Sequence, residues 1–331
     1  MSPVTIIDRV PTFWVEKPWL RFLLGDLAGE IIRDPSGDLV VPHSLIVTQR
    51  PDVLTDQQLD RIRQTPQVGL FHISDEWYRR PVDAYPAFSY VWRQHLHSGL
   101  RGNGIRSIPL GPASVDEISV DLPAASLTPL VERPHPVAFL GKLTTTRFAA
   151  MKNLSTIPGA VVRPSGRFDM RGTALPAAEY MGILRESVFV ACPMGNVHLE
   201  SFRVYEALEA GAVPIVERRR RFDYFALLLG DYPFPSVQAW SEAPRLIHSL
   251  GEGQSLRSIQ KRTRDWWHRY KVELCGSVQA DVTSNDDRRV LITGGRGRGA
   301  RYRELSKHQN LPALARRAQL TAIRLRRHLK T

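Results

Sequence analysis

An arginine and a glutamate three residues apart, Arg203 and Glu206, are the side chains in this sequence whose types and spacing point most directly to chemistry. On a helix, this spacing places both side chains on one face. A guanidinium is suited to bidentate contact with phosphate, and a carboxylate one turn away can accept hydrogen bonds from ribose hydroxyls. The alternative is an exposed ion pair, which stabilises a helix by about 0.5 kcal/mol or less.

The residues around this pair have the pattern of a strand, a helix and a second strand. Residues 188–192 form a short apolar run typical of a strand buried on both faces, and Pro193 and Gly195 end it. A helix is predicted over residues 199–210, and residues 213–216 form another buried strand. In open α/β sheets, ligands bind beyond the carboxyl ends of the strands, where free N–H groups at a helix start attract phosphate. We therefore expect a phosphate site at this edge.

The stretch from Glu200 to Ile215 resembles the donor-site signature of exostosin-type glycosyltransferases. It is similar also to the ribitol xylosyltransferase family, whose signature ends in a proline, two hydrophobic residues and a glutamate, as Pro214 to Glu217 do here. The resemblance implies a nucleotide-sugar donor, with UDP as the nucleotide. The donor-binding residues that it implies here are Pro193, Gly195, Ser201, Phe202, Arg203 and Glu206.

A second candidate phosphate contact precedes this unit. Residues 136–141 are a predicted strand that ends in Phe-Leu-Gly, and Arg147 follows six residues later. The transferases named above open their second domain with a similar strand, which implies that Gly141 lets the backbone approach a pyrophosphate and that Arg147 lies near its charge. The alternative is an ordinary strand-to-helix turn with a surface arginine.

The first domain offers carboxylates for proton transfer. Residues 68–74 form an apolar run that ends in Asp75 and Glu76, at a predicted carboxyl end of a strand. In inverting transferases of this architecture, the general base comes from the first domain, so Asp75 and Glu76 are the predicted catalytic residues, with His72 as a lesser candidate. The alternative for Asp75 is that it caps the next helix. The ribitol xylosyltransferase family has a similar first domain, with Arg93 among the matching residues.

The positive charge of the chain is concentrated at one end. The formal net charge is +12, and residues 288–331 hold 13 of the 45 Lys and Arg and one of the 33 acidic residues. The remaining residues are neutral in sum, which argues against nucleic-acid binding by the body of the protein. The two cysteines have no disulfide or metal-ligand pattern, and no apolar run is long enough to span a membrane. A cytoplasmic protein is therefore expected.

The basic tail has two predicted parts. Residues 277–299 are polar and end in a glycine- and arginine-rich run, which is typical of a flexible linker. Residues 311–330 have leucines and alanines at spacings of three and four beside several arginines, the pattern of a cationic helix on an anionic membrane surface. The tail thus predicts peripheral attachment to the inner face of a membrane. The alternative is a terminal helix that packs on the body.

These observations predict an α/β protein of the GT-B type, with two Rossmann-like domains that face each other across a cleft. The expected divisions are residues 1–130 on the acceptor side, 131–280 for the nucleotide sugar and 281–331 for the linker and tail. The predicted activity is transfer of a sugar from a nucleotide-sugar donor to a glycan or lipid-linked acceptor, without a cofactor. No Asp-x-Asp sequence lies in a suitable loop, since Asp286-Asp287 falls in the linker, so no metal is expected.

Stereochemistry and a rival function complete the sequence-based predictions. When the signature is aligned on Glu206 and Gly211, the first glutamate of a motif found in retaining transferases is replaced by His198, which favours inversion. The alternative function, from a class other than enzymes, is that of a non-catalytic nucleotide-binding protein that uses its basic tail to dock on a membrane or on nucleic acid. Tyr302 and His328 alone among the tail residues could read nucleic acid, which disfavours that partner.

Overall fold

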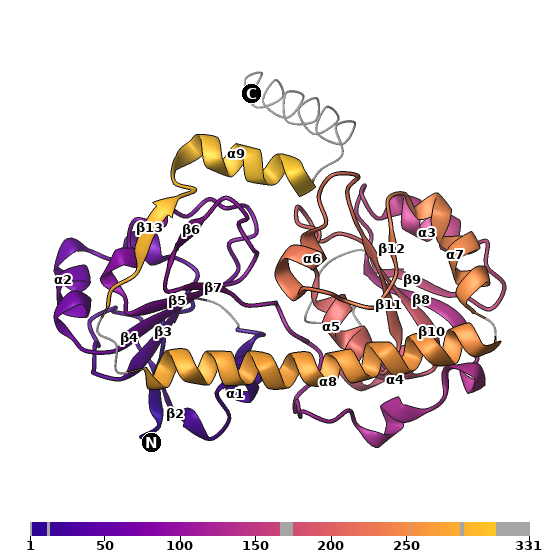
Figure 1. The fold of residues 1–331 in the computed structure, drawn as a ribbon, viewed down its shortest axis with the longest axis horizontal. Coiled ribbons are helices and arrows are strands. Elements are labelled where there is room, and N and C mark those ends of the chain that lie inside the picture. The colour runs from indigo at the N-terminus through magenta and orange to yellow at the C-terminus, as the bar shows by residue number, and fades with distance from the viewer. Residues whose placement is uncertain (1, 12–13, 166–174, 252, 285–287, 309–331) are drawn as a thin grey trace, which may run out of the picture.

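Two parallel sheets form the centre of the molecule in the computed structural model (Figure 1). The structure describes residues 2–11, 14–165, 175–251, 253–284 and 288–308. In the first sheet every neighbouring pair of strands is parallel. Its order is β2 (Ala28–Arg33), β1 (Val4–Asp8), β3 (Ser44–Thr48), β4 (Val68–His72), β5 (Tyr90–Arg93) and β7 (Ile105–Ser107).

The second sheet is also parallel throughout. Its order is β12 (Ser236–Val237), β11 (Val213–Glu217), β10 (Ser187–Cys192), β8 (His135–Lys142) and β9 (Val161–Ser165). The central strands β10 and β11 are buried along their whole length, as expected when helices cover both faces of a parallel sheet. The predicted βαβ unit is confirmed, and the order of these strands brings the ends of β8 and β10 together.

Helices and short helical turns complete the two domains. The first domain has α1 (Lys17–Leu24) and α2 (Asp56–Gln64), and the second has α3 (Phe148–Leu154), α4 (Ala177–Arg185), α5 (Phe202–Glu209), α6 (Tyr224–Leu229) and α7 (Ala243–Leu250). The short 3-10 turns are Gly25–Leu27, Pro51–Val53, Tyr85–Ala87, Ala124–Leu127, Leu130–Glu132 and Trp240–Glu242.

The helix that carries the signature begins later than the sequence predicts. The expected start was residue 199, but α5 begins at Phe202 because Leu199 and Glu200 lie in the loop after β10, with both side chains buried. Ser201, at the start of α5, has extended backbone angles and makes no side-chain cap. Leu199 and Glu200 therefore contact other segments instead of forming the first turn of the helix.

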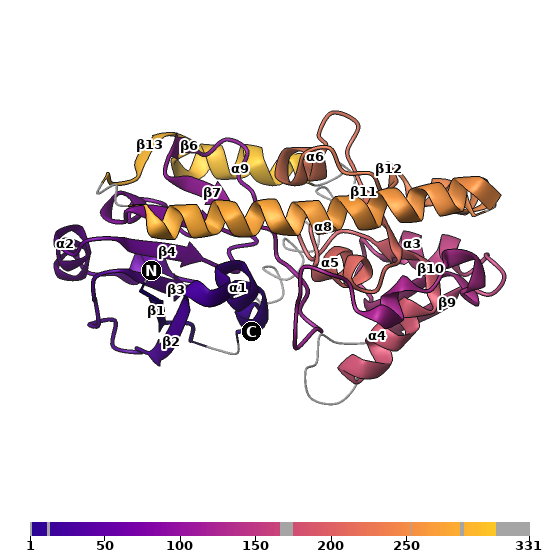
Figure 2. The ribbon, with the colours of Figure 1, turned by 60° about the horizontal axis from the view of Figure 1, so that its bottom comes forward.

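A single long helix, α8 (Gly253–Thr283), runs along both domains (Figures 1 and 2). At one point Trp267 of α8 stacks on Trp19 of α1, with 6.2 Å between the ring centroids. Further along its length α8 packs on α5 and β11 of the second domain. One continuous apolar cluster consequently includes residues of both sheets, and this shared core holds the domains together.

The chain after α8 returns to the first domain, which corrects the prediction of a flexible linker over residues 277–299. Helix α8 continues to Thr283, strand β13 (Leu291–Gly294) pairs antiparallel with β6 (Arg101–Asn103), and α9 (Gly297–His308) follows. The glycines permit this path, since Gly295 and Gly297 have left-handed backbone angles. Residues 311–330 and the pair Asp286-Asp287 lie outside the described residues.

A buried ion pair fixes the signature helix against α8. Lys271 of α8 donates to the Glu209 carboxylate at the end of α5 over 2.9 Å, and Trp267 Nε1 donates to the same carboxylate over 2.8 Å. Both side chains of the ion pair are at most 2% exposed. Lys271 also donates to the carbonyl of Ser119, in the segment between the two sheets. These contacts set the position of α5, and hence of Arg203 and Glu206.

Because this pair is fully desolvated, removing one partner leaves an uncompensated charge in the interior. We expect Lys271→Met to lower the free energy of unfolding by about 3 kcal/mol, measured by urea denaturation. Lys261→Met is the matched control, since Lys261 forms an exposed pair with Asp265 on the same helix, worth about 0.5 kcal/mol or less. Equal losses in the two variants would contradict this account.

Candidate active site at the facing strand ends

The carboxyl ends of the two sheets face each other, and Glu76 joins them. Glu76 follows β4 of the first domain, and its carboxylate accepts hydrogen bonds from the backbone N–H groups of Asn196 and Val197, over 3.0 and 3.2 Å. Those residues belong to the loop after β10 of the second domain. The half-buried Glu76 side chain is thus a contact across the domain boundary, at the edge where ligands of open α/β sheets bind.

Arg203 lies in this site with part of its guanidinium unsatisfied. Its Nε donates to the carbonyl of Leu140 over 2.9 Å, and the guanidinium lies over the Phe139 ring at the end of β8. Its Nη1 is buried and has no hydrogen-bond partner in the structure. Gly141 makes this arrangement possible, because a Cβ atom there would lie 2.4 Å from Arg203 Nη2 and its φ of +131° disfavours other residues.

A second buried arginine lies close to the first. Arg147 donates through Nε to the carbonyl of Met194 over 2.9 Å and through Nη1 to the carbonyl of Lys142 over 3.0 Å. Burial and then the positive charge of Arg203 lower the pKa of Arg147 to about 10, so Arg147 remains cationic at neutral pH. Among the described residues, neither has an acidic side chain within the 4.0 Å of a salt bridge. Glu76 and Glu217 oppose the positive charge of Arg147 only from beyond salt-bridge distance, so the two guanidinium groups form a cationic site that suits an anion.

Glu206 is held beside this site by neutral donors. Its carboxylate accepts from the backbone N–H of Ser114 over 3.1 Å and from the hydroxyl of Tyr180 over 2.6 Å, and it is 4% exposed. Burial and the nearby Glu206 charge raise the pKa of Tyr180, which therefore stays protonated as the donor. Arg203 and Glu206 are both buried and bind different partners, so the alternative of an exposed ion pair is wrong.

The other predicted donor contacts surround the arginines. Pro193 is buried directly after β10, and the N–H of Gly195 donates to the carbonyl of His198 over 2.7 Å within the same loop. Ser201 has a buried hydroxyl without a partner in the structure, and Phe202 begins α5. The structure therefore brings together the loop after β10, the start of α5 and the end of β8. What these residues bind stays a prediction.

The two predicted catalytic carboxylates differ in their surroundings. Asp75 is 6% exposed and accepts hydrogen bonds from Arg93 over 3.0 Å and from the backbone N–H groups of Arg79 and Arg80. It thus caps the turn that follows. The alternative prediction was a cap on a helix, and no helix begins there. His72 is bonded to Tyr85 and Arg93, which both belong to the first domain. Of the three candidates, Glu76 alone contacts the opposite domain through its side chain within the described structure.

Sequence reasoning did not identify a buried cluster at the same boundary. His95 follows β5 of the first domain, His198 and Glu200 precede α5, and His308 ends α9. The rings of His198 and His308 are 3.9 Å apart between centroids, and Tyr78 donates to or accepts from His198 Nε2 over 2.6 Å. His95, His198 and His308 are each more than 100 positions from the next, so no spacing links them. Only His198 and Glu200, which lie two residues apart where the signature begins, could have been noticed.

Two Rossmann-like domains whose strand ends meet at a cationic site define the class of this protein, the GT-B architecture. Residues 131–283, close to the whole second domain, match the family described as the RXYLT1 C-terminal domain. The chain is 26% identical over 195 residues to mouse (Mus musculus) ribitol-5-phosphate xylosyltransferase 1, covering 53% of this chain and 43% of that protein. The predicted resemblance to the ribitol xylosyltransferase family is confirmed.

Solved structures give more distant likenesses. A crystal structure of an alpha1,3-fucosyltransferase is 12% identical with a TM-score of 0.49, covering 86% of this chain and 93% of that one. The structure of T4 phage BGT in complex with its UDP-glucose substrate is 13% identical with a TM-score of 0.47, covering 85% of this chain and all of that one, 100%. In the described part of this chain, none of the helices combines the length and apolar character needed to cross a membrane.

Proposed function

We propose that this protein is a glycosyltransferase that uses a nucleotide-sugar donor, with UDP as the nucleotide. The observation that carries the proposal is the pair of buried arginines, Arg147 and Arg203, neither of which has a carboxylate within salt-bridge distance among the described residues. A diphosphate supplies the negative charge and the several acceptor oxygens that such a pair lacks. The match of the second domain to a xylosyltransferase family supports the same assignment.

In this proposal the donor lies along the edge of the second sheet. The diphosphate takes the free donors of Arg147 and Arg203 near Gly141, and the ribose hydroxyls bond to the Glu206 carboxylate. Because the arginines are already fixed by carbonyl groups, they need little reorganisation as charge builds up on the leaving diphosphate. We propose that this pair makes a divalent metal unnecessary for neutralising the diphosphate.

The first domain supplies the base in this scheme. The acceptor hydroxyl loses its proton to the Glu76 carboxylate while its oxygen forms a bond to the anomeric carbon. The bond from that carbon to the diphosphate oxygen breaks, and its electron pair stays on the diphosphate beside the arginines. Attack opposite the leaving group inverts the anomeric centre. A glycan or a lipid-linked sugar is the acceptor class that we propose.

Substitutions at Arg203 and Glu206 should weaken nucleotide binding, the first through the diphosphate and the second through the ribose. We expect Arg203→Met to bind UDP at least about 30-fold more weakly, which corresponds to about 2 kcal/mol, and to bind uridine almost unchanged. Glu206→Gln should weaken both ligands, because the ribose is common to them. Calorimetric titration measures both affinities, and the exposed Arg257→Met is the matched control.

The same titration tests metal use. UDP affinity should be equal in EDTA and in magnesium or manganese. A requirement for either ion would contradict the proposed role of the arginines, and unchanged UDP affinity in both Arg203→Met and Glu206→Gln would exclude the proposed donor site.

Substitutions at the two adjacent carboxylates should have different effects, one on catalysis and the other on stability. Glu76→Gln is expected to lower kcat by at least about 100-fold with donor affinity retained, because it removes a general base. Asp75→Asn should lower the melting temperature, because it breaks the buried pair with Arg93. The measurements are turnover with purified donor and acceptor, and thermal unfolding. Full turnover in Glu76→Gln would show that the base lies elsewhere, and UDP binding without turnover in the wild type would favour the non-catalytic rival.

The basic tail supports a further proposal, that the protein attaches to the inner face of an anionic membrane. Residues 309–331 hold six Lys and Arg, each worth about 1 kcal/mol near an anionic surface. Since α9 packs on the body, the test is truncation after His308. The truncated chain should bind UDP normally but no longer sediment with phosphatidylserine vesicles at low salt, and neither form should sediment with phosphatidylcholine. Sedimentation of the truncated chain with anionic vesicles would disprove the role of the tail.

A further inference from the structure

Four consecutive arginines, residues 218–221, follow strand β11 and have no role in the proposed donor site. Their surroundings differ. Arg220 and Arg221 are exposed, whereas the side chain of Arg219 is only 10% exposed. An arginine loses hydration and side-chain freedom when it is buried, so the position of Arg219 needs an explanation in its contacts.

Arg219 joins the end of β11 to helix α9. Its Nη1 donates to the Glu217 carboxylate over 2.6 Å, and its Nε and Nη2 donate to the backbone carbonyl of His308 over 2.9 and 2.6 Å. A guanidinium can make these contacts together because its donors lie in a fixed fork. Helix α9 is in turn bonded to the first domain, where the N–H and the hydroxyl of Ser98 donate to Glu304 over 2.9 and 3.0 Å. Arg219 thus connects the second domain to a helix that is anchored on the first.

The contacts continue from Arg219 to the proposed donor site. The second carboxylate oxygen of Glu217 accepts from the backbone N–H of Met194 over 3.3 Å and from the indole N–H of Trp240 over 3.1 Å. The backbone carbonyl of Met194 accepts from Arg147 Nε over 2.9 Å. Met194 is therefore held by Glu217 through its N–H and by Arg147 through its carbonyl. A shift of Glu217 would move the group that orients Arg147.

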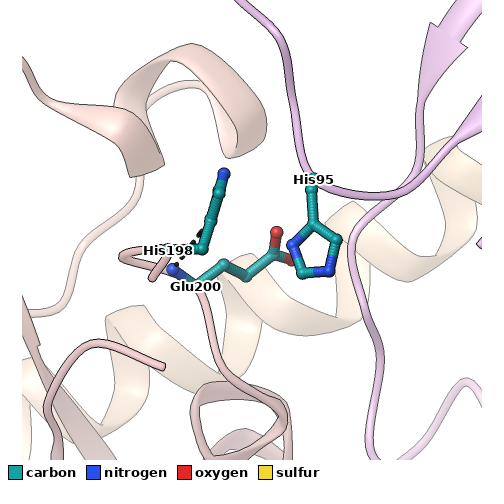
Figure 3. A group of neighbouring side chains, drawn as sticks. All are labelled: His95, His198 and Glu200. Carbon is teal, nitrogen blue, oxygen red and sulfur yellow. Dashed lines mark hydrogen bonds between the residues drawn. The ribbon is translucent and has the colours of Figure 1, made fainter. Parts of the chain in front are cut away.

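The loop that contains Met194 depends on such contacts for its conformation. The structure describes all of residues 193–201, and none of them belongs to a helix or strand. At the domain boundary the Glu200 side chain points towards His95 of the first domain (Figure 3), and the N–H of Leu199 donates to Nδ1 of His308 over 3.4 Å. A binding group must be held to within about 0.5 Å by the groups that support it. Helix α9 supports this loop from outside the donor site.

We propose that Arg219 is a positioning residue for Arg147, acting through Glu217 and the backbone of Met194, and that α9 holds Arg219 in place. This role rests on the proposed function, in which Arg147 binds the diphosphate of the donor. Arg219 itself does not contact the donor in this scheme. Diphosphate affinity consequently depends on α9 being bonded to both domains, although α9 supplies none of the donor contacts.

Calorimetric titration of full-chain variants with UDP and with uridine tests this role. Arg219→Met should bind UDP at least about fivefold more weakly and uridine almost unchanged, because uridine has no diphosphate for Arg147 to contact. Arg220→Met removes the same charge from the exposed neighbour and is the matched control, which should keep UDP affinity within about twofold. In an Arg147→Met background, Arg219→Met should cause no further loss, since its effect passes through Arg147.

Glu217→Gln distinguishes positioning from a simple effect of charge, because the two predict changes of opposite sign. Removing a negative charge near the arginines should strengthen UDP binding if charge alone matters. Positioning predicts weaker binding. Both oxygens of the Glu217 carboxylate accept hydrogen bonds, so a glutamine must turn its own N–H towards the N–H of Arg219 or of Met194 and Trp240. Because glutamine has the shape of glutamate, this variant also provides the measurement if Arg219→Met does not fold.

Three results would overturn the positioning role. They are unchanged UDP affinity in Arg219→Met, stronger UDP binding in Glu217→Gln, and additive losses in the double variant of Arg219 and Arg147. Wild-type UDP affinity in Arg147→Met alone would instead contradict the proposed donor site, so the two failures can be told apart.

Discussion

The central constraint in this structure is the burial of two arginines that, among the described residues, have no carboxylate within salt-bridge distance. Arg147 and Arg203 are fixed by carbonyl oxygens of Lys142, Met194 and Leu140, which orient the guanidinium groups but carry no full charge. Burying such a pair costs stability, so the rest of the domain must support it. That support comes from the buried strands β10 and β11 and from the ion pair between Glu209 and Lys271. The unfavourable charge is retained at the facing strand ends, where open α/β sheets bind their ligands.

The sequence predicts the parts of this site that depend on local pattern. The βαβ unit is defined by the apolar run after residue 187, the helix and the next strand. Helix geometry then places Arg203 and Glu206, three residues apart, on one face. The strand that ends in Gly141 is found in the same way. These features are predictable because strand and helix periodicity, and the residues that end each element, act over a few neighbouring residues.

The remaining features depend on contacts between distant residues. The partners of Glu206 are Ser114 and Tyr180, and no periodicity links them to α5. Helix α5 starts at Phe202 because Leu199 and Glu200 are buried against other segments, which local propensity does not report. The pairing of β13 with β6 turns a glycine-rich stretch into ordered structure. Likewise, His95, His198 and His308 meet only because three separate segments of the chain reach the same boundary.

Helix α8 also determines how the two domains can move. Its 31 residues form a rod about 46 Å long that packs on α1 of one domain and on α5 of the other. Simple separation of the domains would have to break one of these contacts or bend the helix, and both cost free energy. Rotation of one domain about the long axis of α8 would break the hydrogen bonds that Asn196 and Val197 donate to Glu76 across the domain boundary, so it costs free energy as well. Helix α8 therefore restrains the two domains against separation, and the hydrogen bonds of Glu76 restrain them against a twist.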